Sequence, residues 1–397
     1  MTYYRNARLL LAGAALLTMS GPAFSLDGQD LLTKLNAAYA GNGGTLAVKS
    51  VDVNGSDAVM RETTFTPMGA GAKPVVIGDI MLKGVTAESD GSYTIEKATL
   101  PNIDVTEDKT RFTVSDIYMS GVYIPAKTTG DDLSSMLLYD EAHSGSITAV
   151  HEGKQVFSVT ESVASLTQYE DGSGVEFEAS VSGINADLST VADPQSKDAI
   201  EKLGVTKLEG DFTMKGSWEI ASGAFDIEEY ALDFGDVGRL DLSVGLTGFT
   251  MALLKEFQDT TKIMQDKPND EQAQQAAGLA MLGLMQQMSF TGAQISFADA
   301  GITKRGLDYA GAQQGQTGEQ MKQMIKGMAP LMLAQLKLGE LQNSVTTAIN
   351  AYLDNPQNIT ITAEPENAVP FPMIMGAAMG APETLPKVLG VTVSANE

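Results

Sequence analysis

The sequence predicts an α+β protein: a large, curved antiparallel sheet with one apolar face, packed against methionine-rich C-terminal helices. Three observations support this fold class. Apolar and polar residues alternate with a period of two from about residue 45 to residue 247. Turn signals such as Asp90-Gly91 and Ser222-Gly223 separate the alternating stretches. After Gly248 the apolar residues recur at the spacing of helices.

The clearest strand runs from Leu208 to Ile220. One side of it is apolar and the other polar: Leu208, Phe212, Met214, Trp218 and Ile220 against Thr213, Lys215, Ser217 and Glu219. Residues 175–181 and 240–246 alternate in the same way. Strict alternation is typical of antiparallel sheets with one buried face and one wet face.

A helix is expected to begin near residue 27. Asp27 can cap it, Leu31, Leu35 and Tyr39 share one face, and Gly41 ends it.

The C-terminal part is expected to be mostly helical. Helices are predicted at residues 249–264, 271–288, 317–338 with a kink at Pro330, 341–353 and 371–380. A short, partly helical connection is predicted at 301–312, and strands at 290–297, 359–363 and 391–395. The last two strands should be parallel, or antiparallel with another strand between them.

Short sequence patterns recur in the β-region. Residues 79–85 resemble residues 116–122, and residues 91–96 resemble residues 223–228. Such recurrences indicate hairpins repeated at intervals of roughly 30–40 residues, or arise by chance in a long meander.

Residues 1–25 have the layout of a cleavable signal peptide. Arg5 and Arg8 precede an apolar run from Leu9 to Met19, and small residues precede a cleavage point near Ser25. The run is short for a bilayer span, which weighs against the alternative of an N-terminal anchor. The chain has no cysteine for lipid attachment, so the predicted location is the periplasm.

No long linker divides the remaining chain, which favours one packed unit. Within it we distinguish residues 26–250, the N-terminal helix and β-region, from residues 251–397, a helix-rich α+β region packed on the sheet.

The composition excludes several function classes. With 50 Asp and Glu against 26 Lys and Arg, the chain should repel nucleic acid and anionic membranes. Without cysteine, thiol catalysis and thiolate zinc sites are excluded.

The two histidines are the remaining candidates for polar chemistry. His143 and His151 have Glu141 and Glu152 beside them and could contribute zinc ligands. On one strand they would lie about 26 Å apart, too far for one ion. Two surface histidines are therefore the preferred interpretation, and we predict no catalytic residue, metal site or cofactor.

Methionine is concentrated in the C-terminal part. Three interpretations remain open: the side chains fill the core, form an adaptable surface for acyl chains or partner helices, or bind a soft metal such as Cu(I). The last is the weakest, because no histidine or cysteine lies nearby. The candidate residues for binding an apolar ligand are Met321, Met324, Met328, Met332, Met281 and Met285.

Several segments resemble a known group of proteins. The pattern Gly-(Ser/Ala)-(Tyr/Phe)-x-Ile-Glu at 91–96 and 223–228, and the segment from Ile295 to Arg305, resemble periplasmic AsmA-like proteins. Residues 355–386 are similar to uncharacterised exported proteins of Gram-negative bacteria. The resemblance implies an amphipathic sheet that curves into an apolar trough, in a group tied to envelope lipid homeostasis. This chain is shorter than the long bridging members, which favours a soluble carrier, binding or scaffold role over a conduit.

The expected function is that of a non-enzymatic periplasmic protein of envelope homeostasis that binds lipid or another apolar ligand. The alternative is a structural or interaction module with an envelope protein as partner and no small-molecule ligand. A hydrolase is the third choice, because it would need converging carboxylates that no motif in the sequence identifies.

Overall fold

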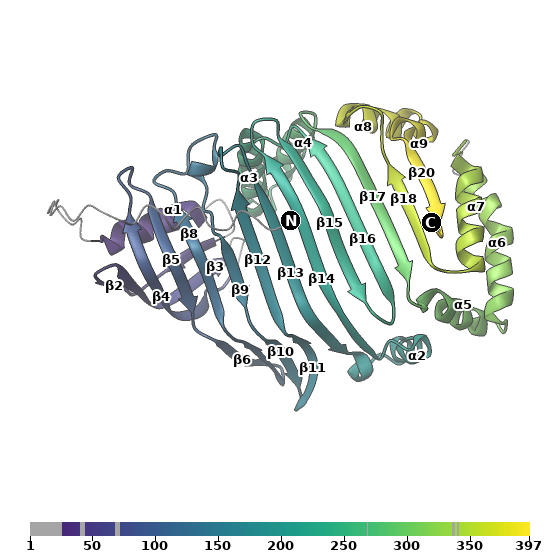
Figure 1. Ribbon diagram of the computed structural model, residues 1–397, viewed down its shortest axis with the longest axis horizontal. Helices are drawn as coiled ribbons and strands as arrows, with labels where there is room; N and C mark the ends of the chain where they lie inside the picture. Colours follow the sequence, from purple (N-terminus) through teal and green to yellow (C-terminus); the bar gives the residue numbers. More distant parts are fainter. Residues whose placement is uncertain (1–25, 40–43, 68–71, 268, 336–337, 340) are drawn as a thin grey trace, which may run out of the picture.

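The computed structural model describes residues 26–397 apart from 40–43, 68–71, 268, 336–337 and 340. The predicted signal peptide lies outside the described residues, as does Gly41. The described part forms one large, open antiparallel sheet with helices around it (Figure 1). The predicted α+β class with a large antiparallel sheet is confirmed.

Among the described residues, the strands account for most of the β-region and four segments beyond it. In chain order they are β1 (Gly44–Ala47), β2 (Ser50–Asn54), β3 (Asp57–Pro67), β4 (Val75–Ala87), β5 (Tyr93–Leu100), β6 (Ile103–Glu107), β7 (Thr110–Val114), β8 (Ile117–Ile124), β9 (Glu141–Ser144), β10 (Ile147–His151), β11 (Lys154–Val159), β12 (Glu161–Gln168), β13 (Gly174–Asp187), β14 (Lys207–Glu219), β15 (Ala224–Phe234), β16 (Gly238–Thr247), β17 (Ser289–Asp299), β18 (Asn358–Ala363), β19 (Val369–Pro370) and β20 (Val391–Ala395).

Most of the helices follow the β-region. They are α1 (Gly28–Tyr39), α2 (Pro194–Leu203), α3 (Met251–Asp266), α4 (Glu271–Met285), α5 (Ile302–Gln313), α6 (Gly318–Gln335), α7 (Leu341–Asp354), α8 (Phe371–Gly380) and α9 (Leu385–Val388), with 3-10 turns at Leu133–Ser135, Leu188–Thr190 and Pro382–Thr384.

The strands lie side by side in nearly sequential order. From the N-terminal end the order is β3, β4, β5, β8, β9, β12, β13, β14, β15, β16, β17, β18 and β20, with β1 and β2 on the outer side of β3. A lower extension of β6, β7, β10 and β11 joins the second half of β13. In Figure 1 this extension lies at the bottom, and α3 and α4 lie at the top.

Several of these strands contain a glycine in the left-handed backbone region, and one of these glycines, Gly183, lies at a bulge of β13. Gly84 and Gly183 have φ angles of 62° and 63°, in the left-handed region that glycine adopts at little cost. Their backbone N–H groups donate to the carboxylates of Asp57 and Asp211 on neighbouring strands, at 3.2 and 2.8 Å. Gly121, with φ of 60°, occupies the place in residues 116–122 that Gly84 occupies in residues 79–85. The recurring sequence pattern therefore corresponds to a recurring left-handed glycine on the two strands that flank β5.

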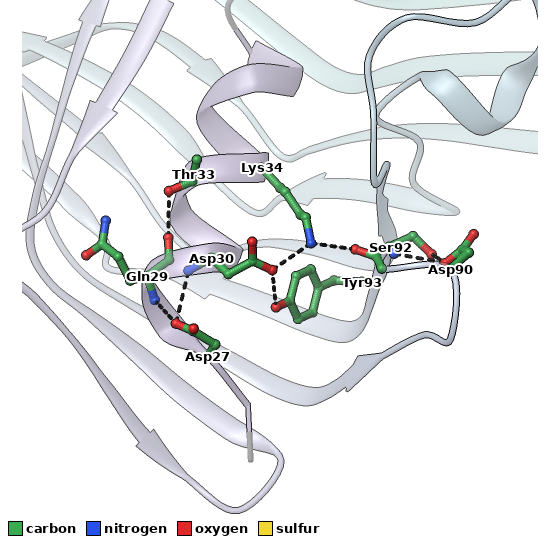
Figure 2. Close-up of polar contacts among 9 residues, drawn as sticks. Asp27, Gln29, Asp30, Thr33, Lys34, Asp90, Ser92 and Tyr93 are labelled. Carbon is green, nitrogen blue, oxygen red and sulfur yellow. Dashed lines mark hydrogen bonds and ion pairs between the residues drawn. The ribbon is translucent and has the colours of Figure 1, made fainter. Parts of the chain in front are cut away.

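Helix α1 is fixed to the sheet by polar groups (Figure 2). Asp27 caps it as predicted, because its carboxylate accepts from the backbone N–H of Asp30 at 3.1 Å. Lys34 Nζ donates to Asp30 Oδ2 at 2.6 Å and to the carbonyl of Gly91 at 2.8 Å. The hydroxyl of Tyr93, at the start of β5, donates to the same Asp30 oxygen at 2.7 Å. These bonds connect α1 to the turn between β4 and β5.

The C-terminal elements follow the predicted order. Thr317 caps α6 as expected, because the backbone N–H of Gln320 donates to Thr317 Oγ1. Gln320 completes a reciprocal cap, since the backbone N–H of Thr317 donates to Gln320 Oε1. Pro330 lies inside α6. Segment 301–312, expected to be only partly helical, is the helix α5.

One topological prediction is wrong: β18 and β20 are direct antiparallel neighbours. The connecting segment does not cross the sheet. Helices α8 and α9 lie at the upper end of these strands (Figure 1), so the chain turns back there as in a long hairpin.

Three clusters of buried apolar residues lie on one side of the sheet. The first packs Leu31 and Leu35 of α1 on β3, β4, β5 and β8. The second packs Met251 of α3 on Val175 and Trp218, and the third joins Leu253 of α3 to Leu284 at the end of α4.

The sheet continues past residue 250, because β17 pairs with β16 along its length. The boundary proposed there from the sequence stays a prediction. None of the helices in the described part of the chain has both the length and the apolar character that crossing a bilayer requires.

Candidate functional site

The candidate site is the apolar face of the sheet. Residues that pair directly across antiparallel strands point to the same side, so the register identifies each face. One row of paired residues is apolar or aromatic at every position from β3 to β20: Ala58, Leu82, Ala98, Met119, Ala142, Ala164, Ala179, Met214, Tyr230, Leu242, Ile295, Ile361 and Val393. We call it the central apolar row. With twelve inter-strand steps of about 4.8 Å, it is on the order of 58 Å long.

Further apolar rows extend this face upwards and downwards. The upper row contains Val175, Trp218, Phe225, Leu246 and Phe290. The lower row crosses the extension through Val105, Phe112, Ala149, Phe157, Ala186 and Leu208. Because Leu208 and Met214 are six residues apart on β14, the lower row shares the side of the central row.

Helices cover this face unevenly. Under α1, the row residues Ala58, Leu82 and Ala98 are at most 8% exposed. At the far end, Ile295 and Ile361 are 47% and 44% exposed. Along the central row, the apolar face is therefore closed at its N-terminal end and open to solvent towards its C-terminal end.

The upper edge of the face is closed by the segment that leads into α3. The indole N–H of Trp218 donates to the carbonyl of Phe249 at 2.6 Å. The ring of Phe249 lies 5.6 Å from that of Phe225 and 5.8 Å from that of Trp218. Aromatic pairs at such distances add to the free energy gained by burial, so they hold this segment against the upper row.

The opposite face of the sheet is polar. Hydroxyl pairs such as Ser296 and Thr360, 2.9 Å apart, lie on it directly beside row residues. Arg239 forms ion pairs there with Glu229 at 2.5 Å and Asp241 at 2.9 Å. At these strands the sheet thus separates an apolar surface from a polar one.

The sequence-predicted methionines are dispersed. Met321 is buried inside α6 at 3% exposure, Met324 borders a shallow depression, and Met328 and Met332 are 49% and 62% exposed. Helix α6 packs on α5 and α7 beside the C-terminal edge of the sheet (Figure 1). The stripe therefore combines one core residue with an outward-facing surface.

The shorter methionine stripe lies elsewhere. Met281 and Met285 are half-buried on α4, which packs on α3 at the upper end of the strands. Met288, just after α4, joins the third core cluster with Leu246 of the upper row. Of the two stripes, only this one lies next to the apolar face.

His143 lies on the polar face. Its side chain is 10% exposed and stacks on Tyr118 at 4.5 Å. Its ring nitrogens lie 2.9 Å from the carbonyl of Asp116 and 3.1 Å from Glu161 Oε1. Burial alone would lower the pKa of His143, but these hydrogen bonds and the two acidic charges outweigh it, so the pKa is raised.

Other charged groups adjoin this stack. Tyr118 donates to Glu141 Oε1 at 2.7 Å, and this bond, more than burial, raises the pKa of Tyr118 to about 12. Lys97 Nζ lies 3.6 Å from the centre of the same ring. His151 bonds separately to Thr110. Among the described residues, no group of three or more His, Asp or Glu side chains is arranged to hold a metal ion.

The sequence did not identify the central apolar row as a site. Alternation marks the apolar side of each strand, but the row exists only once the register is known. The lower extension is still harder to predict from the sequence, because its strands are only 5–6 residues long.

Comparisons with known proteins add little. A family model described as "Uncharacterized protein" matches residues 231–396, from the middle of β15 to the end of β20. A search of curated proteins found no match. The matched segment includes the open half of the apolar face and less than half of the chain.

Proposed function

We propose that this protein is a non-enzymatic protein of the cell envelope that binds lipid or another apolar ligand on the apolar face of its sheet. The observation that carries the proposal is the central apolar row, whose C-terminal members Ile295 and Ile361 are about half exposed. Soluble monomers rarely expose contiguous apolar surface of more than a few hundred Å², and larger patches mark binding sites.

The shape of the face suits chain-like ligands. The row is on the order of 58 Å long, several times the length of one acyl chain, and its side chains range from Ala to Tyr and carry no charge. Each buried methylene contributes about 0.8 kcal/mol, so ten methylenes contribute roughly 8 kcal/mol before the entropic cost of binding. The signal-peptide layout of residues 1–25 supports the envelope as the location.

A protein-interaction role is the second candidate. It is supported by Leu331 and Met332 on α6, which are 70% and 62% exposed on a helix that packs beside the sheet and not over it. Such a surface fits a partner helix without any small-molecule ligand.

Matched substitutions on one strand pair distinguish the candidates. Ile361→Asp places a charge on the apolar face, and Thr360→Asp places it on the polar face one residue away. The native protein should carry extractable lipid, detected by native mass spectrometry and organic extraction. Ile361→Asp should lose most of this lipid, and Thr360→Asp should retain it.

Two results would contradict the proposal. One is native protein that is homogeneous and free of lipid, and that does not take up a fluorescent acyl probe. The other is equal lipid content in both variants. If lipid is absent and Leu331→Asp abolishes capture of a specific envelope protein, the interaction role is correct.

A further inference from the structure

A separate pocket of about 340 Å³ lies between α1, the segment 128–137 and α3. Its volume falls within the range of small-molecule sites. Its lining includes Leu137 of that segment and, from α3, Met251, Leu254, Lys255, Asp259 and Lys262.

The pocket adjoins the apolar face. Met251, in its lining, belongs to the core cluster that contains Trp218 of the upper row. Leu137, also in the lining, packs against the cluster beneath α1. The floor of the pocket is therefore made by side chains that bridge the two covered parts of the sheet.

The lining changes from apolar to basic along α3. Met251 and Leu254 occupy the first turn, and Lys255 and Lys262 follow on the same side of the helix at spacings of one and three turns. This order matches the two parts of an amphiphile, an apolar chain and a charged head.

The charge of the lining is opposite to that of the whole chain. Two lysines and one aspartate, Asp259, give the pocket a net charge of +1, whereas the chain carries −24. Lys255 Nζ donates to the carbonyl of Gly130, which uses one of its three N–H donors. Within the described parts of the chain, neither lysine forms an ion pair, so both remain available to an anion.

We propose that this pocket binds the anionic head of a single-chain amphiphile, a carboxylate or a phosphate, with the chain running over Met251 and Leu254 towards the apolar face. This inference rests on the proposed function, since it specifies the class of apolar ligand. The two lysines would supply charge-assisted hydrogen bonds to the head group.

Binding of four probes to the purified full chain tests the proposal: dodecanoate, dodecyl phosphate, dodecanol and inorganic phosphate. Isothermal titration at low salt should show that dodecanoate or dodecyl phosphate binds about tenfold more tightly than dodecanol, and that inorganic phosphate binds far more weakly. The tighter of the two anionic probes identifies the head group. High salt should reduce the difference from dodecanol.

Lys262→Gln is the decisive variant, because this side chain is exposed and its loss should leave the fold intact. It should weaken binding of the anionic probe about tenfold and leave dodecanol unchanged. Lys262→Arg should restore binding. Lys267→Gln, at the end of α3 and outside the pocket, should have no effect.

The outcomes separate this inference from the proposed function. If all three chain-bearing probes bind equally and Lys262→Gln changes none of them, the inference is wrong and the proposed function stands. If inorganic phosphate binds as tightly as dodecyl phosphate, the pocket is a site for free anions and the inference is wrong. If no chain-bearing probe binds, both proposals fail.

Discussion

The two ends of the sheet carry the same apolar pattern, but only one end is covered. Beneath α1, Ala58 and Leu82 are 1% and 3% exposed, whereas Ile295 and Ile361 in the same row are 47% and 44% exposed. Alternation decides which side chains share a face. Whether that face is buried depends on a helix encoded elsewhere in the chain. An apolar strand pattern therefore predicts either a core or a binding surface, and the covering element distinguishes them.

The largest expected effect is on stability, and it compares substitutions at the covered end and at the open end. Leu31→Ala, in α1, should lower the free energy of unfolding by about 2–5 kcal/mol, because it leaves a cavity at a side chain that is 1% exposed. Ile361→Ala should lower the free energy of unfolding by about 1 kcal/mol or less, because Ile361 buries less apolar surface than Leu31 does. Urea unfolding followed by the fluorescence of Trp218, the single tryptophan, measures both. Equal losses of stability would contradict the difference in burial between the two ends of the sheet.

A bulge substitution tests how closely the strands between the two ends are specified. In Gly183→Ala, the added Cβ would lie 2.2 Å from Thr160 Oγ1 at a φ of 63°. We expect a loss of about 1–3 kcal/mol in urea unfolding. Gly172→Ala is the control, since it has a φ of 72° with no atom within 4 Å, and it should cost about 1 kcal/mol. A Gly183 variant no less stable than the control would show that this middle part of the sheet tolerates repacking.

Removing one hydroxyl at each end gives a smaller contrast. Tyr93→Phe deletes the bond to Asp30 that holds α1, and should cost about 1 kcal/mol. Tyr230→Phe, in the open part of the row, should lower the free energy of unfolding by a few tenths of a kcal/mol at most, because in the described parts of the chain its hydroxyl has no hydrogen bond. Thermal unfolding of the two variants beside the native protein measures the difference. A reversed order would contradict the assigned role of the Asp30 bond.

The smallest expected effect is the pH dependence of His143. Its pKa is raised in the folded protein, so the protonated form stabilises the fold. This contribution is complete below the unfolded value of about 6.5 and is lost as the pH rises through the folded value.

The difference in Tm between the native protein and His143→Gln should therefore shrink as the pH is raised from 6 to 8. His151→Gln serves as the control, because it removes the other histidine and leaves the stack intact. A difference that is constant across this range would rule out the proposed linkage.

Much of the architecture could be predicted from local signals. The caps at Asp27 and Thr317 located two helix starts, and the bounds of α8 and β20 agree with the predicted residues 371–380 and 391–395. These elements are set by neighbouring residues, through capping side chains, proline and the apolar period.

The long-range features could not be predicted in this way. The direct pairing of β18 with β20 depends on where α8 packs, and 27 residues separate the two strands. The pocket beside α3 needs α1, segment 128–137 and α3 to converge from three distant parts of the chain. The spacing of the methionines correctly predicted helices, but it does not show which side of α6 faces its neighbours.

The nearly sequential strand order has a consequence for how the chain folds. From β13 to β17 each strand pairs with the strands that precede and follow it in the sequence. A sheet of this kind gains stability through nearest-neighbour contacts, so it can grow from one strand to the next without closing long loops. Unfolding should accordingly proceed in stages, with the strands of the open end exchanging their amide hydrogens before those beneath α1.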